Sequence, residues 1–166
     1  MIPFGLPIID EIAAGKEKPV SDGDIIGHIQ QTDELEFKFE GQTLKVDLLG
    51  RSRVTFSPGY DYVAVQVSGD SMGEASISPN DYVILRKSKD LPLQPSSGDI
   101  CAVVFRDEDY KATLKRFYFD KSLGRVTLKP ESSNPAHRTR VLRPEAFAGG
   151  NPSVEVVGIA IAVLKP

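Results

Sequence analysis

The chain has 166 residues, of which 40% are hydrophobic and 26% are charged, and its formal net charge is −3. This composition disfavours a disordered chain or a membrane protein and predicts one folded domain, while the charge gives no overall attraction to nucleic acid. The longest apolar stretch, residues 156–164, is about half of the ~18 residues that cross a bilayer, so no membrane contact is expected. The single cysteine, Cys101, excludes an internal disulfide and indicates a cytoplasmic location.

The first twenty residues differ from the rest of the chain. Residues 1–20 contain three prolines and the small-residue step Ala13, Ala14 and Gly15, which charged residues follow. Such a segment predicts an extended, accessible arm. We expect the folded domain to span residues 21–166.

After the arm, short apolar runs alternate with turn residues. In residues 34–40 apolar and charged side chains alternate, which predicts a strand with one dry face; Gly41 predicts a turn, and residues 43–49 a returning strand. Further short strands are expected at residues 24–29, 60–67, 82–85, 100–105, 113–119, 125–128 and 154–164. Residues 72–76 are the best helix candidate, with one or two turns at most. The predicted fold class is therefore mainly β, with antiparallel strands in small packed sheets and at most short helices.

Ser71 is a candidate nucleophile. It follows the predicted strand at residues 60–67, in a turn where Gly69 permits a sharp bend that exposes the serine side chain. The backbone N–H groups of Ser71 and Met72 are candidates for an oxyanion hole. On the turn alone, an ordinary solvent-facing serine is the more common interpretation.

Lys115 is a candidate general base. Strand alternation places it on the same face as Phe117 and Phe119, and burial there disfavours the charged ammonium. A strand lysine whose ammonium reaches water is the alternative. The two histidines, His28 and His137, stand in no nucleophile–base pattern, so a Ser-His-Asp triad is weakly supported.

Three further features favour structural interpretations. Cys101 lies inside an apolar run and is expected in the core. Residues 137–140, with Arg143, form a basic cluster that we expect to be a solvated loop. Residues 154–164 are apolar on both faces, which is typical of a central strand or of one buried in a dimer.

Four segments, taken in order, carry a resemblance to a known family. They are residues 68–72 (Ser-Gly-Asp-Ser-Met), 77–85 (Ile-Ser-Pro-Asn-Asp-Tyr-Val-Ile-Leu), 98–103 (Gly-Asp-Ile-Cys-Ala-Val) and 113–117 (Thr-Leu-Lys-Arg-Phe). Together they resemble the S24 peptidase family, which includes LexA-type repressors, UmuD-type polymerase accessory proteins and self-cleaving phage repressors. Upstream, residues 6–15 resemble the family's linker and self-cleavage site.

The resemblance implies a fold like the LexA C-terminal domain and a self-cleaving serine endopeptidase without metal or cofactor. Ser71 matches the nucleophile, Lys115 the general base, and the bond between Ala14 and Gly15 the scissile bond. The resemblance also implies a homodimer whose self-cleavage is stimulated by the RecA filament on single-stranded DNA. DNA binding is expected only through a separate N-terminal domain, because 14 residues before Gly15 cannot hold a helix-turn-helix.

The sequence departs from the family pattern and leaves alternatives open. The interval between Gly15 and Ser71 is longer than expected, with the excess in residues 34–49, and a smaller expansion lies at residues 91–97. A UmuD-like protein that sheds a short arm remains an alternative. So does a dimerisation module of a transcription regulator with an idle dyad. A type I signal peptidase is less favoured, because no membrane anchor is recognised in the sequence.

Overall fold

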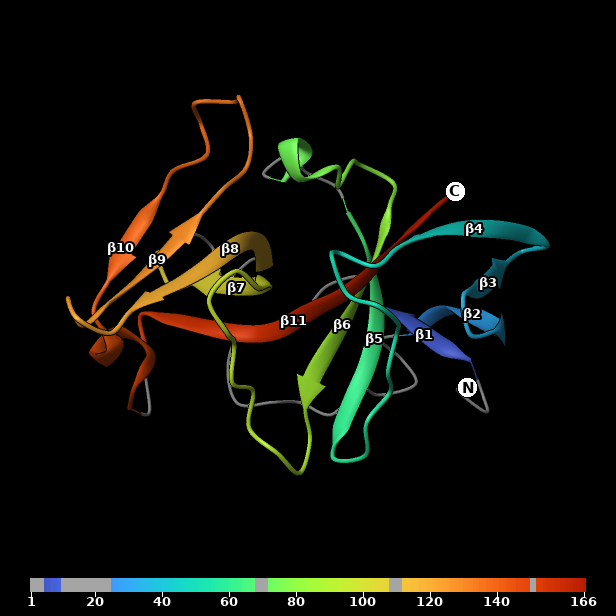
Figure 1. The fold of residues 1–166 in the computed structure, drawn as a ribbon, viewed down its shortest axis with the longest axis horizontal. Helices are drawn as coiled ribbons and strands as arrows, with labels where there is room; N and C mark the ends of the chain where they lie inside the picture. The colour runs from blue at the N-terminus through green and yellow to red at the C-terminus, as the bar shows by residue number, and fades with distance from the viewer. Residues whose placement is uncertain (1–4, 10–24, 68–71, 108–111, 150–151) are drawn as a thin grey trace.

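The computed structural model describes residues 5–9, 25–67, 72–107, 112–149 and 152–166. Within these residues the strands are β1 (Leu6–Ile9), β2 (Ile25–Asp33), β3 (Glu36–Phe39), β4 (Gln42–Asp47), β5 (Tyr60–Gln66), β6 (Tyr82–Ser88), β7 (Ile100–Phe105), β8 (Ala112–Asp120), β9 (Arg125–Lys129), β10 (Arg140–Leu142) and β11 (Val154–Lys165). Two 3-10 turns, η2 (Gly73–Ala75) and η3 (Pro144–Phe147), are the helical elements of this part of the chain. The predicted mainly β fold with at most short helices is confirmed (Figure 1).

The strands form a closed ring with an open sheet attached to it. Their order is β10-β9-β8-β7-β11-β4-β3-β2-β1-β5-β6, and β6 also pairs with β11. This second pairing closes β11, β4, β3, β2, β1, β5 and β6 into a barrel-like arrangement. The strands β7 to β10 form an open sheet that begins at the first half of β11. In Figure 1 this sheet lies along the first half of β11, and the barrel surrounds its second half.

Strand β11 joins the two parts because it is long enough to have different neighbours along its length. Its first half pairs with β7, and its second half pairs with β6 and β4. The register shifts between Val156 and Gly158, next to a glycine where an added Cβ would lie 3.2 Å from Leu85. The apolar character of both faces therefore reflects a central strand of one chain.

The predicted hairpin is present as β3 and β4. Its turn places Glu40 at φ 50° and Gly41 at φ 80°, the left-handed conformations that a tight two-residue turn requires. Phe37 and Leu44 are paired across the hairpin and are both buried. The segment that departs from the expected family spacing thus completes the ring, since β4 also pairs with the end of β11.

The start of the arm is part of the fold. Strand β1 pairs with β2 on one side and with β5 on the other, and Leu6, Ile8 and Ile9 are almost fully buried. The expectation of an accessible arm is therefore wrong for these four residues, because their apolar side chains fill the barrel. Residues 10–20 lie outside the described residues.

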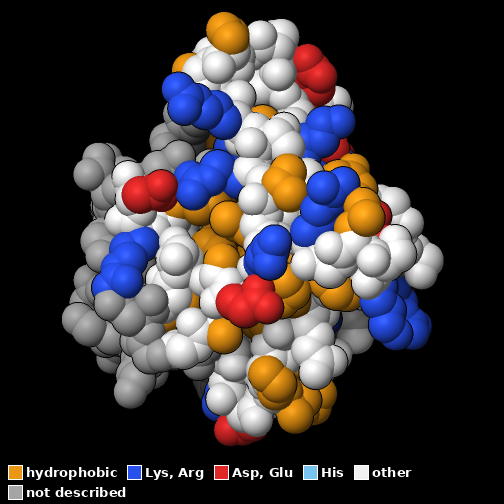
Figure 2. Space-filling view, turned by 90° about the vertical axis from the view of Figure 1, so that its left-hand side faces the viewer, with side chains coloured by type: hydrophobic (Ala, Val, Ile, Leu, Met, Phe, Trp, Pro, Cys, Tyr) orange, Lys and Arg blue, Asp and Glu red, His pale blue; other side chains and the backbone are white. Residues whose placement is uncertain are grey.

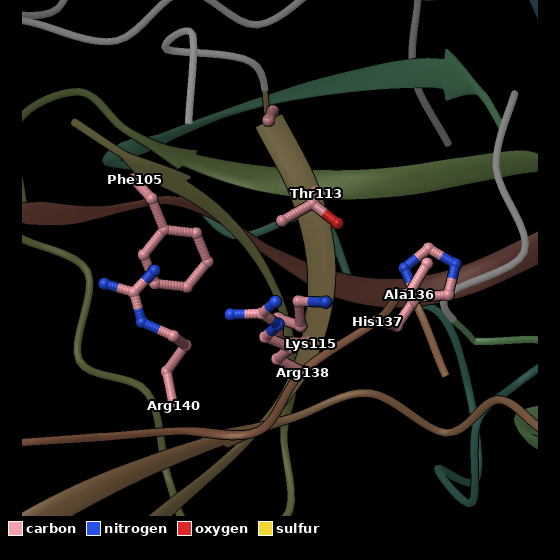
Figure 3. Close-up of a pocket in the computed structure, with 8 residues that line it drawn as sticks. Phe105, Thr113, Lys115, Ala136, His137, Arg138 and Arg140 are labelled. Atoms are coloured by element: carbon pink, nitrogen blue, oxygen red, sulfur yellow. The ribbon is translucent and has the colours of Figure 1, made fainter. Parts of the chain in front are cut away.

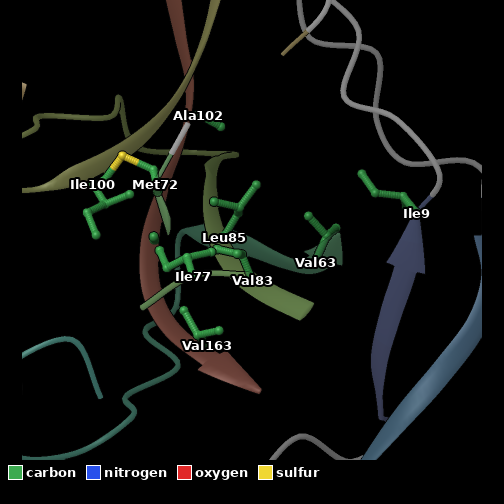
Figure 4. Packing of buried hydrophobic residues seen from close by; sticks show 10 residues of the cluster. Ile9, Val63, Met72, Ile77, Val83, Leu85, Ile100, Ala102 and Val163 are labelled. Atoms are coloured by element: carbon green, nitrogen blue, oxygen red, sulfur yellow. The ribbon is translucent and has the colours of Figure 1, made fainter. Parts of the chain in front are cut away.

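A buried cluster links β1 to the segment after β5. Ile9 and Met72 belong to the same cluster, and Figure 4 shows Val63, Leu85 and other side chains of the cluster between them. Met72 is 1% exposed and packs near Ile100. The cluster therefore anchors the residue that directly follows Ser71.

In the described part of the chain, no helix has the length and apolar character that a membrane span needs.

Candidate active site

Strand β8 carries Lys115 on its inner face. Alternation along the strand turns Lys115 and Phe117 inward, where they are 5% and 7% exposed. Phe119, on the same face, lies towards the strand's end and is 44% exposed. The sequence prediction that Lys115 shares an apolar face is confirmed, and the alternative of a solvated strand lysine is wrong.

Cys101 faces Lys115 from the neighbouring strand. The two residues are opposite each other in the antiparallel β7–β8 ladder, which puts their side chains on one face. Cys101 is fully buried, as predicted. Burial, and to a lesser degree the Asp99 carboxylate, raises the pKa of its thiol to about 12. The thiol therefore stays neutral at physiological pH and adds no charge beside the lysine.

A cavity of about 370 Å³ opens beside Lys115 (Figure 3). It is lined by strand residues of β7 and β8 and by the segment that leads into β10: Phe105, Ala112, Thr113, Lys115, Ala136, His137, Arg138 and Arg140. Figure 3 shows Lys115, Arg138 and Arg140 among the side chains that line it. The cavity is thus a recess with three basic side chains, Lys115, Arg138 and Arg140, in its lining.

The predicted basic cluster is only partly a solvated loop. Arg138 is exposed, but Arg140 lies over the Phe105 ring at 4.4 Å from its centre and 3.3 Å from the Asp107 carboxylate. His137 lies at the cavity. Figure 2 turns the end of the molecule that carries β8 to β10 towards the viewer and shows Lys and Arg side chains spread over it.

The turn after Ser71 is held by main-chain hydrogen bonds. The Met72 carbonyl accepts hydrogen bonds from the N–H groups of Ala75 (3.0 Å) and Ile77 (3.2 Å). The short helix predicted at residues 72–76 is present as the single 3-10 turn η2. Ser71 itself lies outside the described residues.

Ala14 and Gly15, the residues of the predicted scissile bond, also lie outside the described part of the chain. The described residues contain no cluster of three or more His, Cys, Asp or Glu side chains that could hold a metal.

Two ionic contacts near the site were not anticipated from the sequence. Arg116 and Glu131 form a two-point ion pair, with 2.6 Å between Nε and Oε1. Lys165 lies 2.6 Å from the Asp81 carboxylate, which is almost fully buried. Arg116 and Asp81 stand within the segments that carry the family resemblance, but no local pattern in the sequence pairs either of them with its partner.

A family model described as Peptidase S24-like matches residues 7–161. The chain belongs to this family. S24 is a family of serine peptidases.

Individual relatives of this S24 chain are LexA repressors. The LexA repressor of Thermosipho africanus is 48% identical over 77 residues, which are 46% of this chain and 34% of that repressor. The LexA repressor of Desulforamulus reducens is 42% identical over 76 residues, 45% of this chain and 31% of that protein. In these alignments the chain spans about a third of the length of the curated relatives it matches.

Proposed function

We propose that this chain is the self-cleaving regulatory domain of a LexA-like repressor, in which Ser71 and Lys115 cut the chain's own bond between Ala14 and Gly15. The observation that carries the proposal is the state of Lys115: in a serine peptidase family, a lysine that is 5% exposed borders an accessible cavity. Burial disfavours the charged ammonium, so a buried lysine is suited to act as a base.

The register between β1 and β5 supports delivery of the arm to this site. The two strands are parallel, with Ile8 opposite Ala64 and Ile9 opposite Val65. The arm therefore begins alongside β5, the strand that precedes Ser71 in the chain. Strand pairing of this kind holds a peptide through its backbone and leaves side-chain pockets to select its sequence.

The proposed reaction uses groups of this chain and one water molecule. Lys115 Nζ takes the proton of Ser71 Oγ, which attacks the Ala14 carbonyl carbon, and the N–H groups of Ser71 and Met72 hold the oxyanion. The bond to Gly15 breaks as its nitrogen takes the proton from Lys115. Water, with Lys115 again as base, then hydrolyses the ester between Ala14 and Ser71.

The biological setting is proposed from the LexA relatives. We propose that the domain forms a homodimer in the cytoplasm and that the RecA filament on single-stranded DNA stimulates cleavage. DNA binding would belong to a separate N-terminal domain, and cleavage would uncouple it from the dimer. A UmuD-like accessory protein, which sheds only a short arm, is the second candidate.

The decisive experiment is the intact mass of the purified chain after incubation at neutral and alkaline pH. The wild type should yield a fragment that begins at Gly15, and Ser71→Ala should remain whole. Ser78→Ala is the matched control, because Ser78 is an exposed serine on the segment that follows Ser71. If Ser71→Ala yielded the same fragment, Ser71 would not be the nucleophile. If the wild type stayed whole at every pH, an idle dimerisation module would be the better interpretation.

A further inference from the structure

The Arg116–Glu131 ion pair lies on the other side of β8 from Lys115. Two bonds join the side chains, Nε to Oε1 at 2.6 Å and Nη2 to Oε2 at 3.2 Å, and both side chains are 24% exposed. The third nitrogen of Arg116, Nη1, donates to the Gly98 carbonyl at 2.9 Å. The hydrogen bonds between the two side chains lower the pKa of Glu131 and raise that of Arg116, so the pair stays charged over a wide pH range.

The same glutamate contacts the segment that follows Ser71. The backbone carbonyl of Glu131 accepts a hydrogen bond from the N–H of Glu74 at 2.7 Å. Glu74 lies in η2, three residues after Ser71. One residue therefore holds the β8 strand through its side chain and the η2 turn through its main chain.

Arg116 is also the chain neighbour of Lys115. Because adjacent strand residues point to opposite faces, an anchored Arg116 fixes the rotation of β8 that aims Lys115 into the site. Glu131 follows β9, whose last residue, Lys129, is paired with Arg116. The ion pair thus sits where β8, the segment after β9 and η2 meet.

We propose that Arg116 and Glu131 are positioning residues that hold η2, the turn that follows Ser71 in the chain, at a fixed distance from Lys115. Neither residue touches the reacting atoms, and the inference rests on the proposed Ser-Lys function. A serine and a lysine on separate segments need a rigid link, because a misplacement of about 1 Å can cost a hundredfold in rate. The alternative is that the pair only stabilises the β8–β9 sheet.

The test compares Arg116→Gln, Glu131→Gln and the double variant with the wild type. Self-cleavage is measured under conditions in which urea unfolding curves show that all four proteins are folded. We expect each single variant to lower the first-order rate of self-cleavage by about 10- to 100-fold. The double variant should be no slower than the slower single variant, because the two side chains act as one unit. Glu36→Gln is the control: it removes a longer and more exposed ion pair, to Lys38 at 3.7 Å, in the β3–β4 hairpin, far from the proposed link.

Two further measurements separate positioning from stability. Labelling of Ser71 by a fluorophosphonate needs no arm in the site, and its rate should fall in both single variants but not in Glu36→Gln. Hydrogen exchange at the Glu74 amide should become faster in Arg116→Gln. If Arg116→Gln and Glu131→Gln had a lower urea midpoint but cleaved and were labelled at the wild-type rate, the pair would only stabilise the fold and the positioning role would be overturned. A Glu74 amide equally protected in Arg116→Gln would overturn the link itself, whether or not the wild type cleaves. A wild type that neither cleaves nor labels at Ser71 would overturn the proposed function and, with it, this role.

Discussion

Cys101 on β7 lies directly opposite Lys115 on β8, and both side chains are almost fully buried. The cysteine is a small hydrophobic partner, because burial raises the pKa of its thiol to about 12. The lysine thus has a neutral neighbour across the ladder. A charged or bulky group at this position would alter the environment of the base directly.

The Cys101 thiol should be unreactive in the folded protein. Alkylation requires the thiolate, and a thiol that is buried and has a raised pKa supplies almost none at pH 8. We expect labelling by iodoacetamide, followed by intact mass, only when urea unfolds the chain. Rapid labelling of the folded protein would show that the β7–β8 ladder opens readily at this point.

Cys101 should also make stability depend on alkaline pH. Its folded pKa of about 12 lies above the ordinary value of 9.0, so the folded state keeps a proton that the unfolded state loses. The contribution is complete below pH 9, and stability should then fall with pH by up to about 1.4 kcal/mol per unit. Urea unfolding of the wild type and Cys101→Ala between pH 8 and 10.5 measures this. Equal slopes for the two proteins would contradict the prediction.

Self-cleavage should accelerate as pH rises from 7 towards 10. Lys115 must be neutral to accept the Ser71 proton, and its neutral fraction grows with pH. The rate constant should not change on dilution, since arm and site belong to one chain. Lys115→Met, which is similar in length but takes no proton, should flatten the profile measured by intact mass. A yield that stays constant with pH, or falls on dilution, would argue against an intramolecular Ser-Lys reaction.

Gly15→Glu should block cleavage and leave the dyad intact. A tight turn beside the nucleophile tolerates glycine, whereas a long charged side chain there has to be accommodated in the site. N-terminal sequencing of incubated protein checks the result, and labelling of Ser71 by a fluorophosphonate at the wild-type rate is the control. Equal processing of the variant, or a wild-type cut at another bond, would move the scissile bond elsewhere.

Lys165→Met should destabilise the fold by roughly 2 to 3 kcal/mol, because it leaves the Asp81 carboxylate buried without its cation. Lys165 also donates to the Ser76 carbonyl, so the loss should loosen the segment after Ser71. Lys45→Met is the matched control, since Lys45 lies opposite Lys165 in the β4–β11 ladder and is exposed. Urea unfolding measures the difference, and equal midpoints for the two variants would show that the buried pair contributes little.

Local patterns in the sequence predicted much of this fold. The alternation in residues 34–40 and the Gly41 turn gave the β3–β4 hairpin, and β-branched runs gave β5 to β9 and β11. The buried face of Lys115 followed from the two-residue repeat of a strand. These features depend on residues that are close together in the chain, so they can be predicted from a short stretch of sequence.

The sequence by itself determined the strand character of the chain, the apolar face of Lys115 and the family resemblance of its motifs. Only the tertiary structure decided that β1 is a buried strand, that β11 joins a barrel to an open sheet, and that Arg116 meets Glu131. These contacts join residues distant in the chain, and a charge or an apolar run does not specify its partner. Leu6, Ile8 and Ile9 show the reason: a short apolar run between prolines fits an exposed arm or a buried strand equally well, until β2 and β5 supply its hydrogen-bond partners.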